Sequence, residues 1–175
     1  MENRFGFIHD EFDIKVLILF ILSRLPAPVT MEAMADMTLL CDDGISYFDF
    51  ADCFGDLITT GHITEESDLF TITEKGRVNE AAAESNIPYS VRIRAERAAS
   101  TLARVQKRNA MIDTSHSDRG RGGYTVRLTM NDDMGKVLSM ELLIGDELQA
   151  SKMEKNFRKD AENVYTSIVE MLLKD

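Results

Sequence analysis

Apolar and polar residues follow a helical period in the first part of the chain. Between residues 10 and 25 the apolar side chains recur at three- and four-residue spacing, and Pro26 and Pro28 then end the pattern. Thr30 is a suitable cap for a second, short helix in which a methionine recurs every third residue from Met31 to Met37. We interpret these methionines as core residues, because Met readily fills irregular gaps in a core. The pattern predicts two helices in this region.

A third helix is predicted between Gly44 and Gly61. Ser46 is a suitable N-cap, and Asp49 follows at the spacing of a capping box. At 100° per residue, one face of this helix is apolar and the opposite face carries only carboxylates. The predicted apolar face comprises Tyr47, Phe50, Ala51, Phe54, Leu57 and Ile58. The predicted acidic face comprises Asp49, Asp52 and Asp56.

Two short strands are predicted next, at residues 62–65 and 69–72, and Thr73 is suited to cap a fourth helix that runs toward Glu84. After a break at residues 86–88, a long helix is predicted for residues 89–109. The pattern then predicts a three-stranded antiparallel meander at residues 111–115, 124–130 and 136–145. It predicts a final amphipathic helix at residues 146–173. We therefore expect an α+β protein with one domain at residues 1–86. A second domain at residues 87–175 would contain the linking helix, the sheet and the helix that covers it.

The predicted linking helix carries an apolar seam with alternating four- and three-residue spacing. The seam comprises Val91, Ala95, Ala98, Leu102 and Val105. Two explanations remain open: the seam packs on this chain's own sheet, or it pairs with the same helix of a second copy. Arg94, Arg97, Arg104 and Arg108 lie on the other side of the helix. We expect a homodimer.

Charge is distributed unevenly around a net charge of −10. Residues 25–74 contain eleven acidic residues and no Lys or Arg, whereas residues 75–127 contain eleven basic residues and five acidic ones. The chain therefore has an acidic part and a basic part, and each attracts binding partners of the opposite charge.

Three helices followed by a hairpin are the element order of a winged helix-turn-helix domain. The segments GHI at residues 61–63 and LFTITEKGR at residues 69–77 resemble the wing of PadR-like and MarR-like regulators. With CDDGISYFDF at residues 41–50 and IPYSVRIRAE at residues 87–96, most of the chain resembles an uncharacterised winged-helix family of Firmicutes, catalogued as a domain of unknown function. The resemblance implies a dimeric transcriptional regulator that binds DNA.

The charge pattern leads to two interpretations of function. Winged-helix proteins that read DNA usually place the third helix in the major groove, where Lys and Arg neutralise phosphates. In this sequence the third helix and the wing contain acidic residues but no Lys or Arg. In the first interpretation, DNA is still bound, by Ser46 and Tyr47 as readers and by Lys75, Arg77, Arg94 and Arg97 as phosphate contacts. In the second, the domain is a protein-interaction module, and Asp49, Asp52 and Asp56 dock on a basic protein partner.

Residues that carry chemistry do not form a recognisable motif. The three histidines are far apart, Cys41 and Cys53 lack ligand spacing, and the Gly-rich segment at residues 117–123 joins two strands instead of opening a helix. We therefore expect no enzyme activity, no cofactor and no metal. The longest apolar run has seven residues, which is too short for a membrane span, and the two cysteines suit a reducing compartment. We expect a cytoplasmic protein without membrane association.

Overall fold

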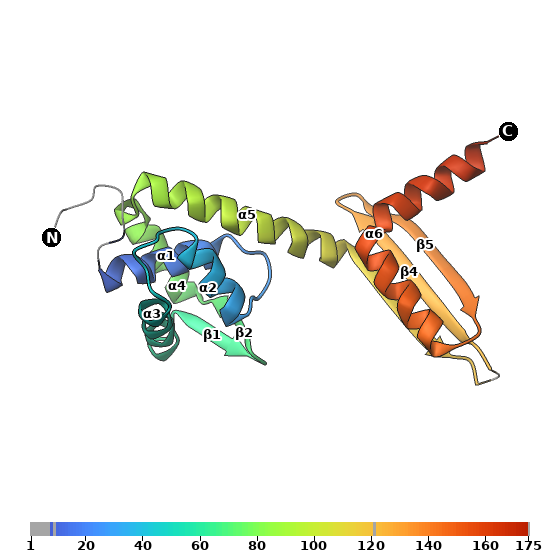
Figure 1. The fold of residues 1–175 in the computed structure, drawn as a ribbon, viewed down its shortest axis with the longest axis horizontal. Coiled ribbons are helices and arrows are strands. Elements are labelled where there is room, and N and C mark those ends of the chain that lie inside the picture. The colour runs from blue at the N-terminus through green and yellow to red at the C-terminus, as the bar shows by residue number, and fades with distance from the viewer. Residues whose placement is uncertain (1–7, 9, 121, 175) are drawn as a thin grey trace. The chain divides into compact units, whose positions relative to one another are not determined.

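The computed structural model describes residue 8, residues 10–120 and residues 122–174. Its elements are shown in Figure 1. In chain order they are α1 (Glu11–Ser23), α2 (Met31–Leu39), α3 (Tyr47–Thr59), β1 (Ile63–Glu66), β2 (Leu69–Ile72), α4 (Glu74–Ala83), the 3₁₀ turn η1 (Glu84–Asn86), α5 (Tyr89–Met111), β3 (Ile112–Asp118), β4 (Tyr124–Asp132), β5 (Gly135–Ile144) and α6 (Glu147–Leu173). The chain divides between Gln106 and Lys107 into two compact units, each with its own hydrophobic core. The predicted α+β architecture is confirmed.

Helix α1 is the central element of the N-terminal unit. Every residue from Val16 to Leu22 is buried, so the helix is apolar around its whole circumference. It packs against α2, α3 and α4. Asp10 caps its first turn by accepting a hydrogen bond from the Asp13 amide at 2.9 Å.

The N-terminal unit has the topology of a winged helix. Strands β1 and β2 form the wing as an antiparallel hairpin, and Ser67 and Asp68 turn it with φ values of 55° and 61°. Two consecutive positive φ values suit the right-handed twist of a two-residue hairpin. Val29, in the loop between α1 and α2, adds a third short strand position, because it exchanges backbone hydrogen bonds of 2.8 and 3.1 Å with Phe70 of β2. The predicted three helices and wing are confirmed.

A charged contact joins α1 to α4. The Arg24 guanidinium lies 3.2 Å from the centre of the Phe20 ring and donates to the Glu80 carboxylate at 3.0 Å. It also pairs with Glu84 at 3.4 Å. Since Glu80 is buried, removing Arg24 would leave an uncompensated charge in the core.

The first part of α5 belongs to the N-terminal unit. Val91, Ala95 and Ala99 are fully buried in the core of that unit. Further along α5, the Gln106 amide donates to the backbone carbonyls of Ala27 and Pro28 at 3.2 and 3.1 Å. The compact units therefore divide after residue 106, whereas the sequence prediction divided the chain after residue 86.

The C-terminal unit is a three-stranded antiparallel sheet in the order β3-β4-β5, with α6 on one face. Ile112 pairs with Met130, and Leu128 pairs with Met140. Residues of even number from Val126 to Met130 point into the core, where they meet Phe157 of α6. The opposite face is mainly polar and holds an ion pair between Arg127 and Glu141.

Helix α6 is interrupted at Asp160, which has the non-helical angles φ −146° and ψ 41°. The predicted final helix over residues 146–173 is confirmed, and the break within it is a feature that the sequence pattern did not indicate. The Arg108 guanidinium, at the end of α5, reaches the break and donates to the carbonyls of Arg158 and Lys159 at 2.8 and 3.0 Å. It also binds both oxygens of the Glu162 carboxylate, at 2.8 and 2.7 Å.

Among the residues that the structure describes, no helix combines the length and the apolar character that crossing a membrane requires.

Candidate functional site

Helix α3 is fixed at its start by reciprocal hydrogen bonds. The Ser46 hydroxyl accepts from the Asp49 amide at 3.1 Å, and the Asp49 carboxylate accepts from the Ser46 amide at 3.2 Å. The predicted capping box is confirmed. Ser46, a predicted DNA reader, is therefore engaged within its own helix.

The buried face of α3 fixes which residues point outward. Phe50, Cys53, Phe54 and Leu57 are buried, and the Phe54 ring meets the Phe70 ring of the wing at 5.0 Å. The three predicted acidic residues, Asp49, Asp52 and Asp56, are exposed on the opposite side.

The first turn of α3 exposes two aromatic rings. Phe48 is 79% exposed and Tyr47 is 53% exposed, with 6.4 Å between the ring centroids. The helical period had assigned Tyr47 to the apolar face, but Tyr47 is the first residue of the helix and lies at the rim of the core. Tyr47 still contacts Phe50 at 6.2 Å, so the ring is half covered.

We call Tyr47, Phe48, Asp49 and Asp52 the α3 patch. Among the described residues, α3 and the wing contain no Lys or Arg, and the wing adds the exposed Glu65, Glu66 and Asp68. The patch is therefore aromatic and acidic.

Two acids in this region are not free to meet a partner, because one forms an ion pair within the chain and the other is buried. Asp56 pairs with Lys15 of α1 at 2.8 Å, and this contact raises the pKa of Lys15. Asp42, one of the eleven acidic residues between positions 25 and 74, is buried and accepts from the amides of Ile8 and Gly44, both at 2.8 Å. Sequence spacing could not reveal that backbone amides surround Asp42.

The predicted basic contacts near the wing bind their own chain. Lys75 donates to the Thr60 carbonyl, at the end of α3, at 2.6 Å. Arg77 donates to the Ser23 carbonyl at 3.4 Å. Both side chains belong to exposed residues of α4, so their charges still face solvent.

The arginines of α5 have different surroundings. Arg94, Arg97 and Arg104 are exposed, and none of them forms an ion pair with a described residue. Their spacing of three and seven residues places them on one side of the helix. Arg108 was grouped with them from the sequence, but its guanidinium is bound at the break in α6.

The apolar seam of α5 is largely covered by the chain itself. Val91 and Ala95 are fully buried, and Ala98 and Leu102 pack against the same core while remaining partly exposed. Val105 is 49% exposed. The part of the seam that a second copy could reach is therefore small.

The described residues show no group of three or more His, Cys, Asp or Glu side chains placed to hold a metal ion. Cys41 and Cys53 are buried, and burial raises the pKa of each thiol to about 11, which keeps both protonated at neutral pH. His62 contacts Thr60 and Asn79 through its two ring nitrogens, at 2.7 and 2.6 Å. Burial, with a smaller effect of Lys75, lowers the pKa of His62.

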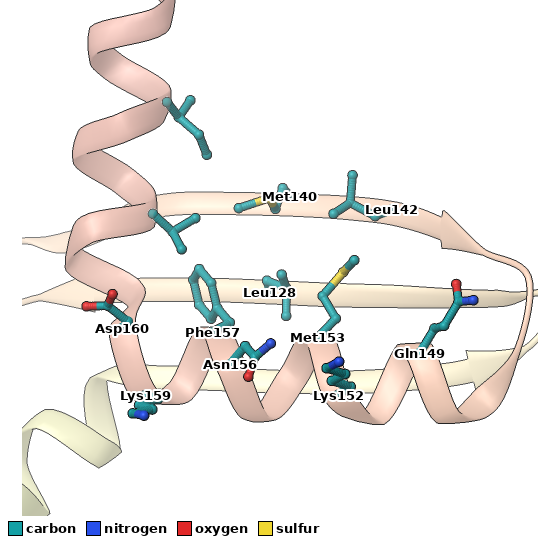
Figure 2. A pocket seen from close by; sticks show the side chains of 12 residues that line it. Leu128, Met140, Leu142, Gln149, Lys152, Met153, Asn156, Phe157, Lys159 and Asp160 are labelled. Atoms are coloured by element: carbon teal, nitrogen blue, oxygen red, sulfur yellow. The ribbon is translucent and has the colours of Figure 1, made fainter.

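The C-terminal unit contains a feature that the sequence analysis missed. An open groove of about 950 Å³ lies between the sheet and the two halves of α6, as Figure 2 shows. We call it the α6 groove. It is lined by Leu128, Met140, Leu142, Gln149, Lys152, Met153, Asn156, Phe157, Lys159, Asp160, Val164 and Ile168. The sequence offered no signal for it, because the groove depends on the break at Asp160.

One protein-family model matches almost the entire length of the chain. The model described as "Domain of unknown function (DUF4364)" matches residues 14–172. Comparisons with curated proteins and with solved structures find no match.

Proposed function

Since the chain belongs to the DUF4364 family, whose description states no function, we propose a function from the chain's own surfaces. We propose that the N-terminal unit is a winged-helix interaction module of a regulatory protein. In this proposal the α3 patch docks on a basic protein partner instead of entering the major groove of DNA.

The observation that carries this proposal is the combination of exposed aromatic rings with exposed carboxylates. Phe48 and Tyr47 offer large, rigid surfaces at the start of α3, and burying such rings supplies much of the binding energy in protein interfaces. Asp49 and Asp52 add negative charge beside the rings, which favours and orients a positively charged partner.

The same surface disfavours duplex DNA. A helix inserted in the major groove brings its exposed side chains within a few ångströms of phosphates, well inside the Debye length of about 8 Å at physiological salt. Among the described residues of α3 and the wing, no cation is available to release counterions, which are the main source of affinity for a duplex.

Two binding measurements test the proposal. In fluorescence anisotropy at ~50 mM salt, we expect a mixed-sequence duplex to show no binding to the full chain. A photo-crosslinking amino acid in place of Phe48 should yield a discrete adduct with a basic protein in cells. The same amino acid in place of Val78, which is exposed on α4, is the matched control and should not yield that adduct.

The captured protein must then bind the purified chain directly. We expect this binding to become about tenfold weaker in each of the variants Phe48→Ala and Asp52→Asn. Because both residues are exposed, neither substitution should alter the fold. Unchanged affinity in both variants would remove the α3 patch as the docking site.

A second candidate function rests on the exposed arginines of α5. In this candidate the protein is a dimeric DNA-binding transcriptional regulator, similar to PadR-like and MarR-like proteins, that contacts phosphates through Arg94, Arg97, Lys75 and Arg77. Duplex binding that weakens steeply between ~50 and ~200 mM salt would favour it. The Arg94→Ala/Arg97→Ala variant should then reduce the slope of log affinity against log salt by about 2.

A further inference from the structure

The sheet of the C-terminal unit is covered by its own helix over only part of its apolar face. Helix α6 lies mainly over β3 and β4. On the same face, β5 presents four apolar side chains in alternate positions, which are Leu138, Met140, Leu142 and Ile144. All four are at least partly exposed, and Leu142 is 38% exposed. The hydrophobic core therefore ends at an open edge.

The break in α6 creates this open edge. Before Asp160 the helix runs along the sheet, and at Asp160 it changes direction. The two halves of α6 therefore form an elbow beside the apolar side chains of β5 (Figure 2). Met140 and Leu142 lie on the strand that the first half of the helix leaves uncovered (Figure 2). The α6 groove is the space inside the elbow, and Met153 and Phe157 form part of its wall.

The second half of α6, Ala161–Leu173, has an apolar stripe that packs on the C-terminal core at Val164 and becomes exposed toward its end. Val164 and Ile168 are partly buried at the groove, whereas Met171 and Leu172 continue the stripe and are exposed. Leu172 is 79% exposed. The spacing of four, seven and eight residues is that of a helix that packs one face against another surface.

The same chain thus offers both an open apolar groove and a helix whose apolar stripe ends in exposed side chains. We propose that the α6 groove is a dimer interface, in which the second half of α6 from a second copy lies over β5, and the partner's groove receives the same helix half in return. A two-fold axis allows this exchange, because it makes one surface meet an identical one. The proposal concerns the C-terminal unit and does not depend on the proposed docking function of the α3 patch.

Charge complementarity favours a second copy as the occupant. Lys152 and Lys159, from the first half of α6, line the groove. From Asp160 to Leu173 the chain contains no Lys or Arg, and Glu170 is exposed near the end of the apolar stripe. Two elbows that meet across a two-fold axis bring the acidic half of one helix toward the lysines of the other.

The dimensions also fit. A helix from Ala161 to Leu173 is about 20 Å long at 1.5 Å per residue. Strand β5 has 10 residues, so it spans about 33 Å and can accommodate the full length of that helix.

Sedimentation equilibrium of the full chain tests the proposal. We expect a dimer for the unmodified chain and at least a tenfold weaker dimerisation constant for Leu172→Glu. The control is Leu143→Glu, because Leu143 is 65% exposed on the opposite face of the sheet and its replacement should leave the dimer intact. Circular dichroism should show the same helix content for both variants.

Charge reversal identifies the contact more sharply. Lys152→Glu and Glu170→Lys should each weaken the dimer, and the double variant should recover most of the loss, because the swapped charges meet again across the two-fold axis. In addition, cysteines at positions 142 and 172 should form a disulfide between two chains. The native Cys41 and Cys53 are buried and will not compete.

Either of two results would overturn the proposal. One is a monomeric chain at ~50 μM, a concentration at which an apolar interface of this kind should be occupied. The other is a dimer that is insensitive to Leu172→Glu but is dissociated by Val105→Glu, which would assign the interface to the exposed end of the α5 seam.

Discussion

Gly76 shows how a single residue fixes the contact between the wing and α4. A Cβ atom at this position would overlap the His62 carbonyl oxygen and lie 2.7 Å from the Ile72 side chain. The residue is buried at the first turn of α4, where its amide donates to the Thr73 hydroxyl at 3.1 Å. The close approach of α4 to the wing therefore requires glycine, although the pattern LFTITEKGR indicated only a wing followed by a capped helix.

We predict that Gly76→Ala lowers the free energy of unfolding by about 1–3 kcal/mol, because the methyl group must displace a backbone carbonyl in a packed region. Urea denaturation of the full chain measures the change. Gly55→Ala is the matched control, since Gly55 is also helical and no atom lies within 4 Å of its added Cβ. We expect this control to be neutral or to stabilise the fold by up to about 1 kcal/mol. Equal effects of the two substitutions would contradict the assignment.

At the scale of elements, the geometry of α6 depends on a side chain from another helix. Arg108 satisfies carbonyls at the break and binds Glu162 just beyond it. The guanidinium binds the carboxylate and two carbonyls at once, which the single ammonium group of Lys does not reproduce. The sequence placed Arg108 on a basic stripe, because nothing in its spacing indicates that α6 will be broken opposite it.

We predict that Arg108→Met destabilises the C-terminal unit by about 1–3 kcal/mol through the loss of charge-assisted hydrogen bonds, with solvent exposure reducing the effect. Amide hydrogen exchange should accelerate in the second half of α6 above all. Arg104→Met is the control, because Arg104 is exposed and forms no ion pair with a described residue. Unchanged exchange beyond Asp160 would show that the break does not need Arg108.

The same contact has a defined pH dependence. The hydrogen bond from Arg108 lowers the pKa of Glu162 below its ordinary value of 4.5. A carboxyl whose pKa is lowered in the folded state stabilises the fold at pH values above its unfolded pKa, and this contribution is lost as the pH falls through the folded pKa. The difference in stability between the unmodified chain and Arg108→Met should therefore shrink below pH 4.5.

At the scale of the whole molecule, the chain has two separate hydrophobic cores. The N-terminal core contains α1 and the start of α5, and the C-terminal core contains the sheet and α6. Since the two clusters have no buried residue in common, each can lose its packing without the other.

We predict two unfolding transitions in differential scanning calorimetry. Gly76→Ala should lower the midpoint of one transition and Arg108→Met should lower the midpoint of the other, because each residue contacts a different core. If the α6 groove is a dimer interface, the transition of the C-terminal unit should also rise with protein concentration. A single transition that both variants shift equally would show that the units unfold together.

The amino-acid sequence by itself determined the elements and most of their caps. Helical spacing, Pro26, the capping residues Ser46 and Thr73, and strict alternation in β4 are local signals, so the winged-helix order and the C-terminal meander follow from neighbouring residues. The acidic character of α3 is also local, because all charges of one helix face lie within a short segment.

The tertiary structure alone decided which charged and apolar groups are available. Asp42 is buried, Asp56 is paired with Lys15, Arg108 is bound at α6, and Tyr47 is half exposed, and each of these outcomes depends on residues distant in sequence. The α6 groove likewise arises only where β5, β4 and both halves of a broken helix meet. Periodicity along one chain indicates which face of an element turns inward, but the groups that cover or pair with a given side chain are set by residues distant in sequence.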